Sequence, residues 1–280
     1  MDSEEDKKMR ALTTRRSMPV SDEYHEIVID KSFLQGCKLE QLRAIIERGH
    51  RILLTAEIGL EIFTTNEPIL KKCFKNLLAF RDYIDFIDHL GTLFKVEIEK
   101  HIPCVPISSY FLNGMLNQNF NYEFNKEQIK HIKNFENDVE ALGAQKFDRI
   151  VLEIKNTLPT ITIQDIQNPV VIRKIYASLR TENLPPVEII NEQWAIFRRL
   201  QVDCMAAIEY LHSFRNGQFD IKNRKKEHNQ IDFRIIIFAL LTKGLASNDR
   251  LIRRYFKFLC PDGILFPNFS PTVCGSTFTS

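Results

Sequence analysis

The chain has 280 residues, of which 44% are hydrophobic and 26% charged, and its formal net charge at pH 7 is +2. With only 10 Gly and 11 Pro it is neither collagen-like nor dominated by linkers, and its composition is that of a globular protein. No apolar run approaches the roughly 18 residues of a membrane helix. The first residues are charged, with no apolar segment behind them. We therefore expect no membrane span, no signal peptide and a cytoplasmic protein.

The 6 cysteines are scattered along the chain, and none of them forms a Cys-x-x-Cys pair. Structural zinc sites place their ligands at short, regular spacings, which this chain does not have. We expect reduced, buried cysteines and no structural zinc.

The first part of the chain alternates between strand and helix patterns. Residues 1–23 are polar without apolar periodicity, which predicts a flexible arm. Residues 25–30 and 51–55 are short apolar runs that predict buried strands. Residues 38–48 and 56–63 carry apolar side chains at helical spacing and predict helices. This alternation is typical of an α/β fold with a parallel sheet.

The middle of the chain has mostly helical periodicity. It predicts a loop at the Asn-rich residues 113–125, and at residues 160–165 a helix start and a short strand both stay open. The clearest helical segments are residues 69–78, 83–101, 126–142 and 147–157.

The last part of the chain returns to an α/β pattern. Residues 188–214 and 231–242 predict helices, separated by a polar, basic loop at 220–230. A short strand is expected to end at Asp249, and residues 251–258 predict one more helix.

These patterns predict an α/β fold with a central parallel sheet. Residues 24–66 and 190–267 would form the core, and residues 67–189 a mostly helical segment. Residues 1–23 and 268–280 would be an arm and a tail.

Four acidic residues stand at positions where a site is expected. Asp30 and Asp249 end predicted strands, and ligand sites of open α/β sheets form outside the carboxyl ends of strands. Glu61 follows Thr55 by six positions, within the helix after the second strand. Asp232 is predicted to lie in the first turn of an apolar helix. These four carboxylates could therefore share one crevice.

A cluster of four carboxylates predicts metal binding, because without a cation the charges repel one another and their pKa values rise. Mg²⁺ and Mn²⁺ prefer oxygen ligands and supply what phosphodiester cleavage needs. Each acid also has a simpler explanation. Asp232 could cap its helix, Asp249 could end a strand and Glu61 could face solvent.

The order and context of these residues resemble the PIN-domain nuclease family. Four motifs of that family occur here in order. The first is apolar-apolar-Asp-x-Ser at residues 27–32, and the second is a Ser or Thr followed six positions later by Glu, here Thr55 and Glu61. The third is an Asp that opens an apolar helix, here Asp232, and the fourth is Ser-x-Asp, here Ser247 and Asp249. The resemblance covers about residues 24–66 and 190–267. In ordinary family members the Glu and the third Asp are far closer in sequence than they are here, which is why 67–189 is interpreted as an insertion.

The resemblance implies a three-layer α/β/α sandwich with a central parallel sheet and a helical insertion at residues 67–189. It also implies a metal-dependent endoribonuclease that uses Mg²⁺ or Mn²⁺. It implies metal binding by Asp30, Asp232 and Asp249, with Glu61 binding directly or through water. Ser32 and Ser247 would be supporting polar groups in substrate binding. RNA is a better expectation than DNA because the wider family is mostly RNA-directed. A regulatory protein and a second copy of the chain stay open as further partners.

Basic residues flank the predicted acidic site. Eleven Lys or Arg and four Asp or Glu lie between Arg215 and Lys257. Such a region suits a polyanion, although charge alone fits a solvated face better. The residues expected to hold phosphates are Arg224, Lys225, Lys226 and Arg250.

Several alternatives stay open. Asp203 could join the site, but an ion pair with Arg198 or Arg199 is the better explanation of an acid among apolar neighbours. Glu57, four positions before Glu61, could replace it.

A catalytically inactive PIN-like module that binds nucleic acid or protein is the main alternative function. A phosphatase that uses Asp30 as nucleophile would want a second acid where Ser32 stands.

Overall fold

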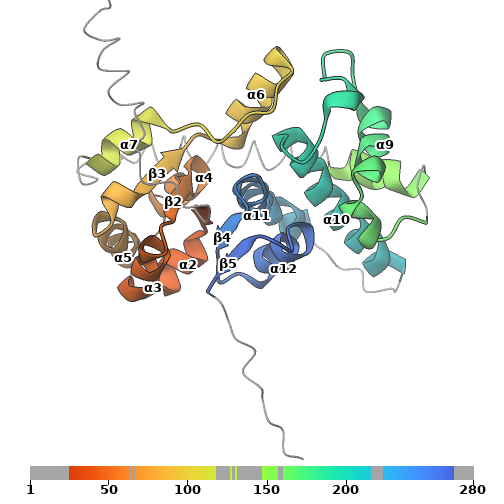
Figure 1. The fold of residues 1–280 in the computed structure, drawn as a ribbon. Helices are drawn as coiled ribbons and strands as arrows, with labels where there is room; N and C mark the ends of the chain where they lie inside the picture. Colours follow the sequence, from red (N-terminus) through yellow and green to blue (C-terminus); the bar gives the residue numbers. More distant parts are fainter. Residues whose placement is uncertain are drawn as a thin grey trace, which may run out of the picture.

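A computed structural model of the chain describes residues 25–63, 65, 67–117, 127, 130, 147–156, 160–215 and 223–267, with residues 67, 213–215 and 223–229 described by their backbone alone. Its elements are drawn in Figure 1. In chain order they are β1 (Glu26–Ile29), α2 (Lys31–Gly36), α3 (Leu39–Glu47), β2 (Arg51–Thr55), α4 (Ala56–Phe63), α5 (Glu67–Leu78), η1 (Arg81–Tyr83), β3 (Ile84–Ile87), α6 (Leu90–Lys100), α7 (Tyr110–Asn117), η2 (Gln164–Gln167), α9 (Pro169–Leu179), η3 (Val187–Ile189), α10 (Ala195–Arg215), α11 (Asn223–Thr242), β4 (Gly244–Ala246), α12 (Arg250–Leu259) and β5 (Ile264–Phe266).

The sheet has five strands in the order β3-β2-β1-β4-β5, and every neighbouring pair is parallel. The chain first builds outward from β1 through β2 to β3, and later returns to place β4 on the other side of β1. Val28 of β1 is in register with Leu245 of β4. A Cβ atom at Gly244 would stand 2.6 Å from the carbonyl oxygen of Glu26, so the close approach of β4 to β1 requires glycine there. The strand order reverses between β1 and β4, and this is where open α/β sheets form their ligand crevice.

Helices pack on the sheet as the sequence predicts for a three-layer α/β/α sandwich. Helix α11 contacts β1 and β4, while α3 and α4 contact β2. Helix α10 packs along α11, and in Figure 1 α9 and α10 lie beyond α11 as seen from the sheet. The side chains of Ile27, Val28 and Ile29 are fully buried, as expected for a strand covered on both faces. The predicted fold class is therefore confirmed.

A buried carboxylate of α6 connects that helix to the start of α10. Glu97 of α6 is fully buried, and its oxygens accept hydrogen bonds from the backbone N–H groups of Ala195 (2.6 Å), Ile196 (2.9 Å) and Cys104 (3.3 Å). Two of these donors belong to the first turn of α10, whose N–H groups have no partner within the helix. The pKa of Glu97 is raised by its burial, while the three backbone hydrogen bonds act in the opposite direction.

Most of the predicted elements are present. The strands at 25–30 and 51–55 correspond to β1 and β2, and the helices at 38–48 and 56–63 to α3 and α4. Helix α5 matches the segment predicted at 69–78, residues 147–156 are helical, and α10 and α12 occur close to their predicted places. The stretch 160–165, which the pattern left open, leads into the 3₁₀ helix η2. The cysteines within the described ranges are free and buried, as expected.

The helix predicted at 83–101 is wrong in its first part, because residues 84–87 form strand β3. Ile84, Phe86 and Ile87 are buried, and the strand pairs with β2 along its length. A strand buried on both faces has no alternating pattern, so periodicity cannot separate it from the helix that follows. The sheet thus takes one strand from within residues 67–189, the stretch assigned to the insertion.

Two predicted loops are partly helical, and a strand was missed. Helix α7 occupies residues 110–117, and α11 begins at Asn223, inside the loop predicted at 220–230. The first residues of α11 are polar and lack the apolar spacing from which helices were predicted, so this part of the helix was missed. Strand β5 has three residues, too few to carry a pattern.

Several predictions fall on other parts of the chain. The arm at 1–23, the tail at 268–280 and most of the helix predicted at 126–142 lie outside the described residues. None of the helices in the described ranges is both long and apolar enough to cross a lipid bilayer.

Candidate active site

Asp30 follows β1 at the point where the strand order reverses. Its side chain is 5% exposed, and Oδ2 accepts hydrogen bonds from the hydroxyl groups of Ser32 and Ser247, the latter at 2.9 Å. Burial raises the pKa of Asp30, and the carboxylates of Glu61 and Asp249 raise it further, while the two serine hydrogen bonds lower it. Ser32 and Ser247, which follow two strands far apart in the sequence, therefore both bond to the carboxylate of Asp30, as the prediction requires.

Residues 247–249 form the turn between β4 and α12. The fully buried Ser247 hydroxyl donates to Asp30 and accepts from the backbone N–H of Asp249 at 3.0 Å. Asp249 is the N-cap of α12, where its Oδ1 accepts from the N–H groups of Leu251 (2.7 Å) and Ile252 (3.0 Å). The strand that was expected to end at Asp249 ends at Ala246, so that prediction is wrong by three residues, and Asp249 instead caps α12 near Asp30.

Asn248 connects this turn to the residues after β1 through two hydrogen bonds. Its backbone N–H donates to the Ser32 hydroxyl, and its side-chain amide donates to the Ser32 carbonyl oxygen, both at 3.1 Å. The sequence motifs assigned no role to Asn248. Its position between two predicted site residues was the available signal.

Glu61 reaches the site from α4, the helix after β2. The hydroxyl of Thr55 accepts a hydrogen bond from the backbone N–H of Ile58 at 3.3 Å, so Thr55 caps α4. Glu61 pairs with Lys31, whose Nζ stands 2.8 Å from Oε1. Its side chain is 34% exposed. Lys31 was not among the predicted site residues, although it stands next to Asp30 in the sequence.

Asp232 lies in the middle of α11 and not in its first turn, because that helix begins at Asn223. The alternative that Asp232 caps a helix is therefore wrong. Burial raises its pKa to about 7, and the carboxylates of Asp30, Asp249 and Glu61 contribute to that rise. All three of these acids belong to the predicted set. The fold thus brings the four predicted acids from both ends of the chain close enough to repel one another.

The four carboxylates do not form a ready-made metal site in this structure. In the described part of the chain, no three His, Cys, Asp or Glu side chains are placed to hold a metal ion. Three of the carboxylates instead have other partners: the serines for Asp30, Lys31 for Glu61, and the start of α12 for Asp249. Carboxylates that repel one another are expected to take such partners. As a donor set, four clustered carboxylates suit a hard divalent cation.

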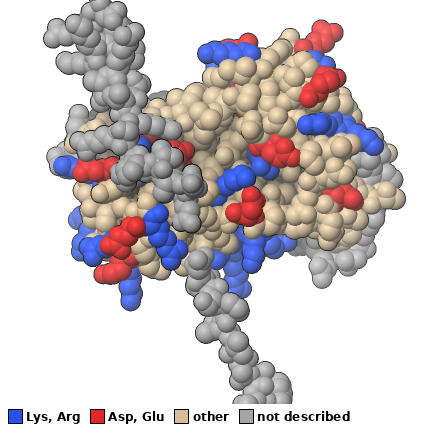
Figure 2. Space-filling model, viewed as in Figure 1, with Lys and Arg blue, Asp and Glu red and all other residues tan. Residues whose placement is uncertain are grey.

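The basic residues near the site divide into three groups. Arg250 is exposed next to Asp249, as a phosphate-binding residue would be. Arg253 instead donates to the carbonyl oxygens of Ser247 and Phe266, both at 2.8 Å, and Arg254 pairs with Glu209. Arg224, Lys225 and Lys226 lie in the first turn of α11, and their side chains fall outside the described ones. On the face shown in Figure 2, basic and acidic side chains are interspersed.

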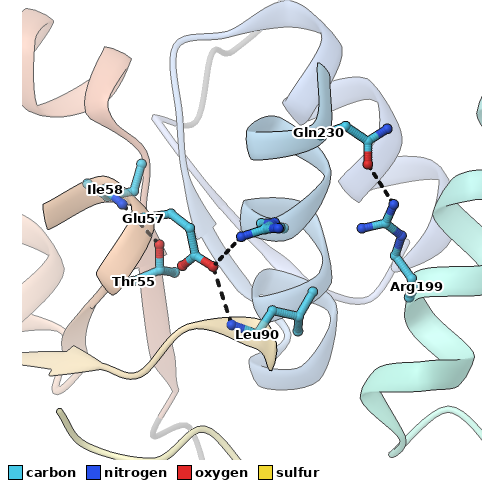
Figure 3. A network of polar contacts seen from close by, with 7 residues as sticks. Thr55, Glu57, Ile58, Leu90, Arg199 and Gln230 are labelled. Carbon is cyan, nitrogen blue, oxygen red and sulfur yellow. Dashed lines mark hydrogen bonds and ion pairs between the residues drawn. The ribbon is translucent and has the colours of Figure 1, made fainter. Parts of the chain in front are cut away.

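The two competing acids have other roles. Asp203 pairs with Arg199, Nε to Oδ2 at 2.5 Å, as the ion-pair explanation predicts. Glu57 pairs with Arg234 at 3.2 Å and accepts from the backbone N–H of Leu90 at 3.3 Å. Figure 3 shows Glu57 pointing toward α11 from one side, while Arg199 reaches Gln230 of the same helix from the other. Neither acid is among the groups that raise the pKa of Asp232.

A cavity of about 500 Å³ lies apart from the acids, between α11 and the helices α6, α9 and α10. None of the four acids lines it. The cavity is therefore not the crevice that the strand order predicts, and we place the candidate active site at the four acids, whose carboxylates lie near enough to influence one another.

The chain was compared with protein-family models, curated proteins and solved structures, and none of these matches it.

Proposed function

We propose that this protein is a divalent-metal-dependent nuclease of PIN-like type that hydrolyses RNA. The observation that supports this most is the grouping of four acids: Ser247 bonds to both Asp30 and the backbone of Asp249, and the pKa of Asp232 is raised to about 7 by burial first and then by the carboxylates of Asp30, Asp249 and Glu61. These acids come from separate elements, and the parallel sheet gathers them where its strand order reverses. Concentrating four negative charges at a partly buried place is costly unless a cation offsets them.

In this proposal Asp30, Asp232 and Asp249 hold Mg²⁺ or Mn²⁺, with Glu61 as a direct or water-mediated ligand. The metal supplies charge neutralisation on the scissile phosphate and an activated water. The buried Ser247 hydroxyl, together with Ser32, fixes the orientation of the Asp30 carboxylate. Asp249 is fixed by its hydrogen bonds to the start of α12. A preset carboxylate geometry favours metal binding because fewer side chains must be ordered when the metal binds.

The RNA assignment rests on the family resemblance and on basic residues beside the site. Arg250 is exposed next to Asp249, and Arg224, Lys225 and Lys226 begin the helix that carries Asp232. We include a cytoplasmic location in the proposal, as the sequence suggests. A regulatory protein or a second copy of the chain is compatible with it.

The test is cleavage of labelled single- and double-stranded RNA and DNA with Mn²⁺, comparing wild type with Asp30→Asn, Asp232→Asn and Asp249→Asn. Asparagine keeps the size of aspartate and, at position 249, caps a helix about as well. Asp262→Asn is the matched control, because Asp262 is an exposed aspartate that pairs with Lys243 at 3.0 Å. We expect RNA cleavage by wild type and the control, and a loss of at least about a hundredfold in each site variant.

The other outcomes are equally informative. Cleavage that persists in all three site variants would place the activity elsewhere or in a contaminant. RNA binding without cleavage, in a wild type that binds no Mn²⁺, would favour the inactive PIN-like module over the enzyme.

A further inference from the structure

The cavity beside α11 has the dimensions of a small-molecule site. Its volume of about 500 Å³ lies within the range of roughly 300–1,000 Å³ seen for ligand pockets. Much of its lining is apolar and is contributed by side chains of four elements, among them Leu90, Phe94, Tyr176, Leu179, Ile196 and Leu200.

Positive charge dominates the polar part of this lining. Among the described residues the lining holds three arginines, Arg149, Arg199 and Arg234, and one aspartate, Asp203. Arg199 pairs with Asp203, and Arg234 pairs with Glu57, which does not line the cavity, so Arg149 is the positive charge in excess of these two ion pairs. The side chain of Arg199 is 17% exposed and that of Arg234 is 18% exposed, so both guanidinium groups are largely withdrawn from water. An anion that enters here meets little competing solvent, which strengthens its attraction to the arginines.

The two inner arginines are held in place. Arg199 donates to Asp203 at 2.5 Å and to Gln230 at 2.6 Å, which uses two of the five N–H groups of its guanidinium. Arg234 donates to Glu57 at 3.2 Å. Figure 3 shows Arg199 reaching Gln230 of α11 from one direction and Glu57 approaching the same helix from the other. Fixed guanidinium groups lower the ordering cost of binding.

The cavity is separate from the acidic site. Gln230 and Arg234, which line it, stand four positions apart and so share one face of α11. Asp232 lies between them in sequence, about 200° away around the helix axis. Helix α11 therefore presents the cavity and the acids on different faces.

We infer that this cavity binds a small molecule with an apolar body and a single anionic head group, either carboxylate or sulfonate-like, with the head group at the arginines. The apolar walls disfavour a highly polar ligand. The one positive charge in excess, at Arg149, together with the unused N–H groups of Arg199, favours an anionic head group over a neutral one. This inference does not depend on the proposed nuclease activity.

The test uses 8-anilinonaphthalene-1-sulfonate, an aromatic anion whose fluorescence rises in apolar surroundings, titrated against the full chain. Leu179→Trp and Thr181→Trp narrow the cavity, and Arg149→Gln removes an exposed positive charge from its lining. Val170→Trp and Lys174→Gln make the same two kinds of change at positions of α9 that do not line the cavity. We expect one saturable site, about tenfold weaker in the first three variants and unchanged in the two controls.

Competition then tests the head group. Decanoate should displace the dye and bind by calorimetry, whereas decanol, which has the same chain without the charge, should do so at least about tenfold more weakly. Equal displacement by both compounds would overturn the anionic part of the inference. Dye binding that is unchanged in both tryptophan variants, provided their unfolding curves show a native fold, would overturn the site itself. So would the absence of saturable binding of both dye and decanoate to the wild type.

Discussion

The pair of Lys31 and Glu61 is the contact within the site that most directly opposes metal binding. Lys31 is 17% exposed and places a positive charge 2.8 Å from one proposed ligand. A cation held there competes with Mn²⁺ for the same carboxylate, and it also lowers the negative potential of the whole cluster. The proposed site therefore includes its own counter-charge.

Lys31→Gln should tighten Mn²⁺ binding by roughly threefold to tenfold at low salt, because Glu61 loses its lysine partner and the cluster becomes more negative. Isothermal titration with MnCl₂ measures this affinity directly. Lys95→Gln is the control, since Lys95 pairs with Glu99 on the exposed face of α6. An affinity that is equal in wild type and Lys31→Gln would show that Glu61 and the metal do not share a position.

Asp232 predicts how the metal-free protein responds to pH. Its ordinary pKa of 3.8 rises to about 7 in the fold, mainly through burial. Between these two values the folded state keeps a proton that the unfolded chain has released. Raising the pH through this window therefore lowers the free energy of unfolding, and the loss is complete above about pH 7.

Asp232→Asn removes this titration, so the variant should be more stable than wild type at pH 8 by roughly 4 kcal/mol and nearly equal to it at pH 4. Urea unfolding in EDTA at both pH values gives the two differences. The variant also removes the repulsion between Asp232 and the carboxylates of Asp30, Asp249 and Glu61, which acts in the same direction. A difference of the same size at pH 4 and pH 8 would contradict the raised pKa.

Helix α12 shows how one residue serves both an element and the site. Asp249 accepts hydrogen bonds from two N–H groups of the first turn, and its carboxylate also raises the pKa values of Asp30 and Asp232. The capping contribution and the charge contribution can be separated, because asparagine retains the first and loses the second.

Asp249→Ala should lower the free energy of unfolding by about 1 kcal/mol relative to Asp249→Asn, since both variants remove the charge and alanine alone removes the cap. Urea unfolding of the two variants in the same buffer measures that difference. Both variants should lose RNA cleavage to the same degree. If the asparagine variant cleaved RNA as wild type does, Asp249 would be a cap without a part in the chemistry.

How far the sequence predicts these elements depends on how each one is buried. Strands β1 and β2 and helix α4 carry apolar runs with distinct spacing, and they were predicted within one or two residues. Strand β3 is buried throughout and merges with the pattern of α6. The start of α11 is polar, so the pattern places Asp232 in a first turn although it lies mid-helix.

The grouping of the acids was predicted better than the environment of each one. The sequence patterns assigned the four acids to predicted strand ends and helix starts. This was enough to predict that they lie near one another, because a parallel topology brings strand ends together. Their individual partners, such as Lys31 for Glu61 or the α12 backbone for Asp249, depend on how side chains pack in the folded chain. A single sequence carries little signal for such contacts.

At the scale of the whole molecule, α11 connects the sheet to the remaining helices. It contacts β1 and β4 on the sheet side, and it packs against α10 and α12. Its first turn carries Arg224, Lys225 and Lys226, and its middle carries Asp232. Lys225 stands seven positions before Asp232, which is about two turns, or roughly 10 Å, along the same helix. One helix therefore links the proposed phosphate-binding residues to the proposed chemistry.

This arrangement predicts that the basic turn affects binding of RNA and not the chemical step. Changing Arg224, Lys225 and Lys226 together to Gln should weaken binding of single-stranded RNA and reduce the slope of log K against log salt by up to about 2, at roughly 0.7 for each phosphate that the variant no longer neutralises. Fluorescence anisotropy in EDTA, over a series of salt concentrations, measures both quantities without cleavage. The cleavage rate at saturating RNA should stay close to that of wild type.

Lys257→Gln, on the exposed face of α12, is the control for the removal of a positive charge elsewhere. An unchanged salt slope in the triple variant would remove the start of α11 from the RNA path and leave Arg250 as the remaining predicted phosphate-binding residue.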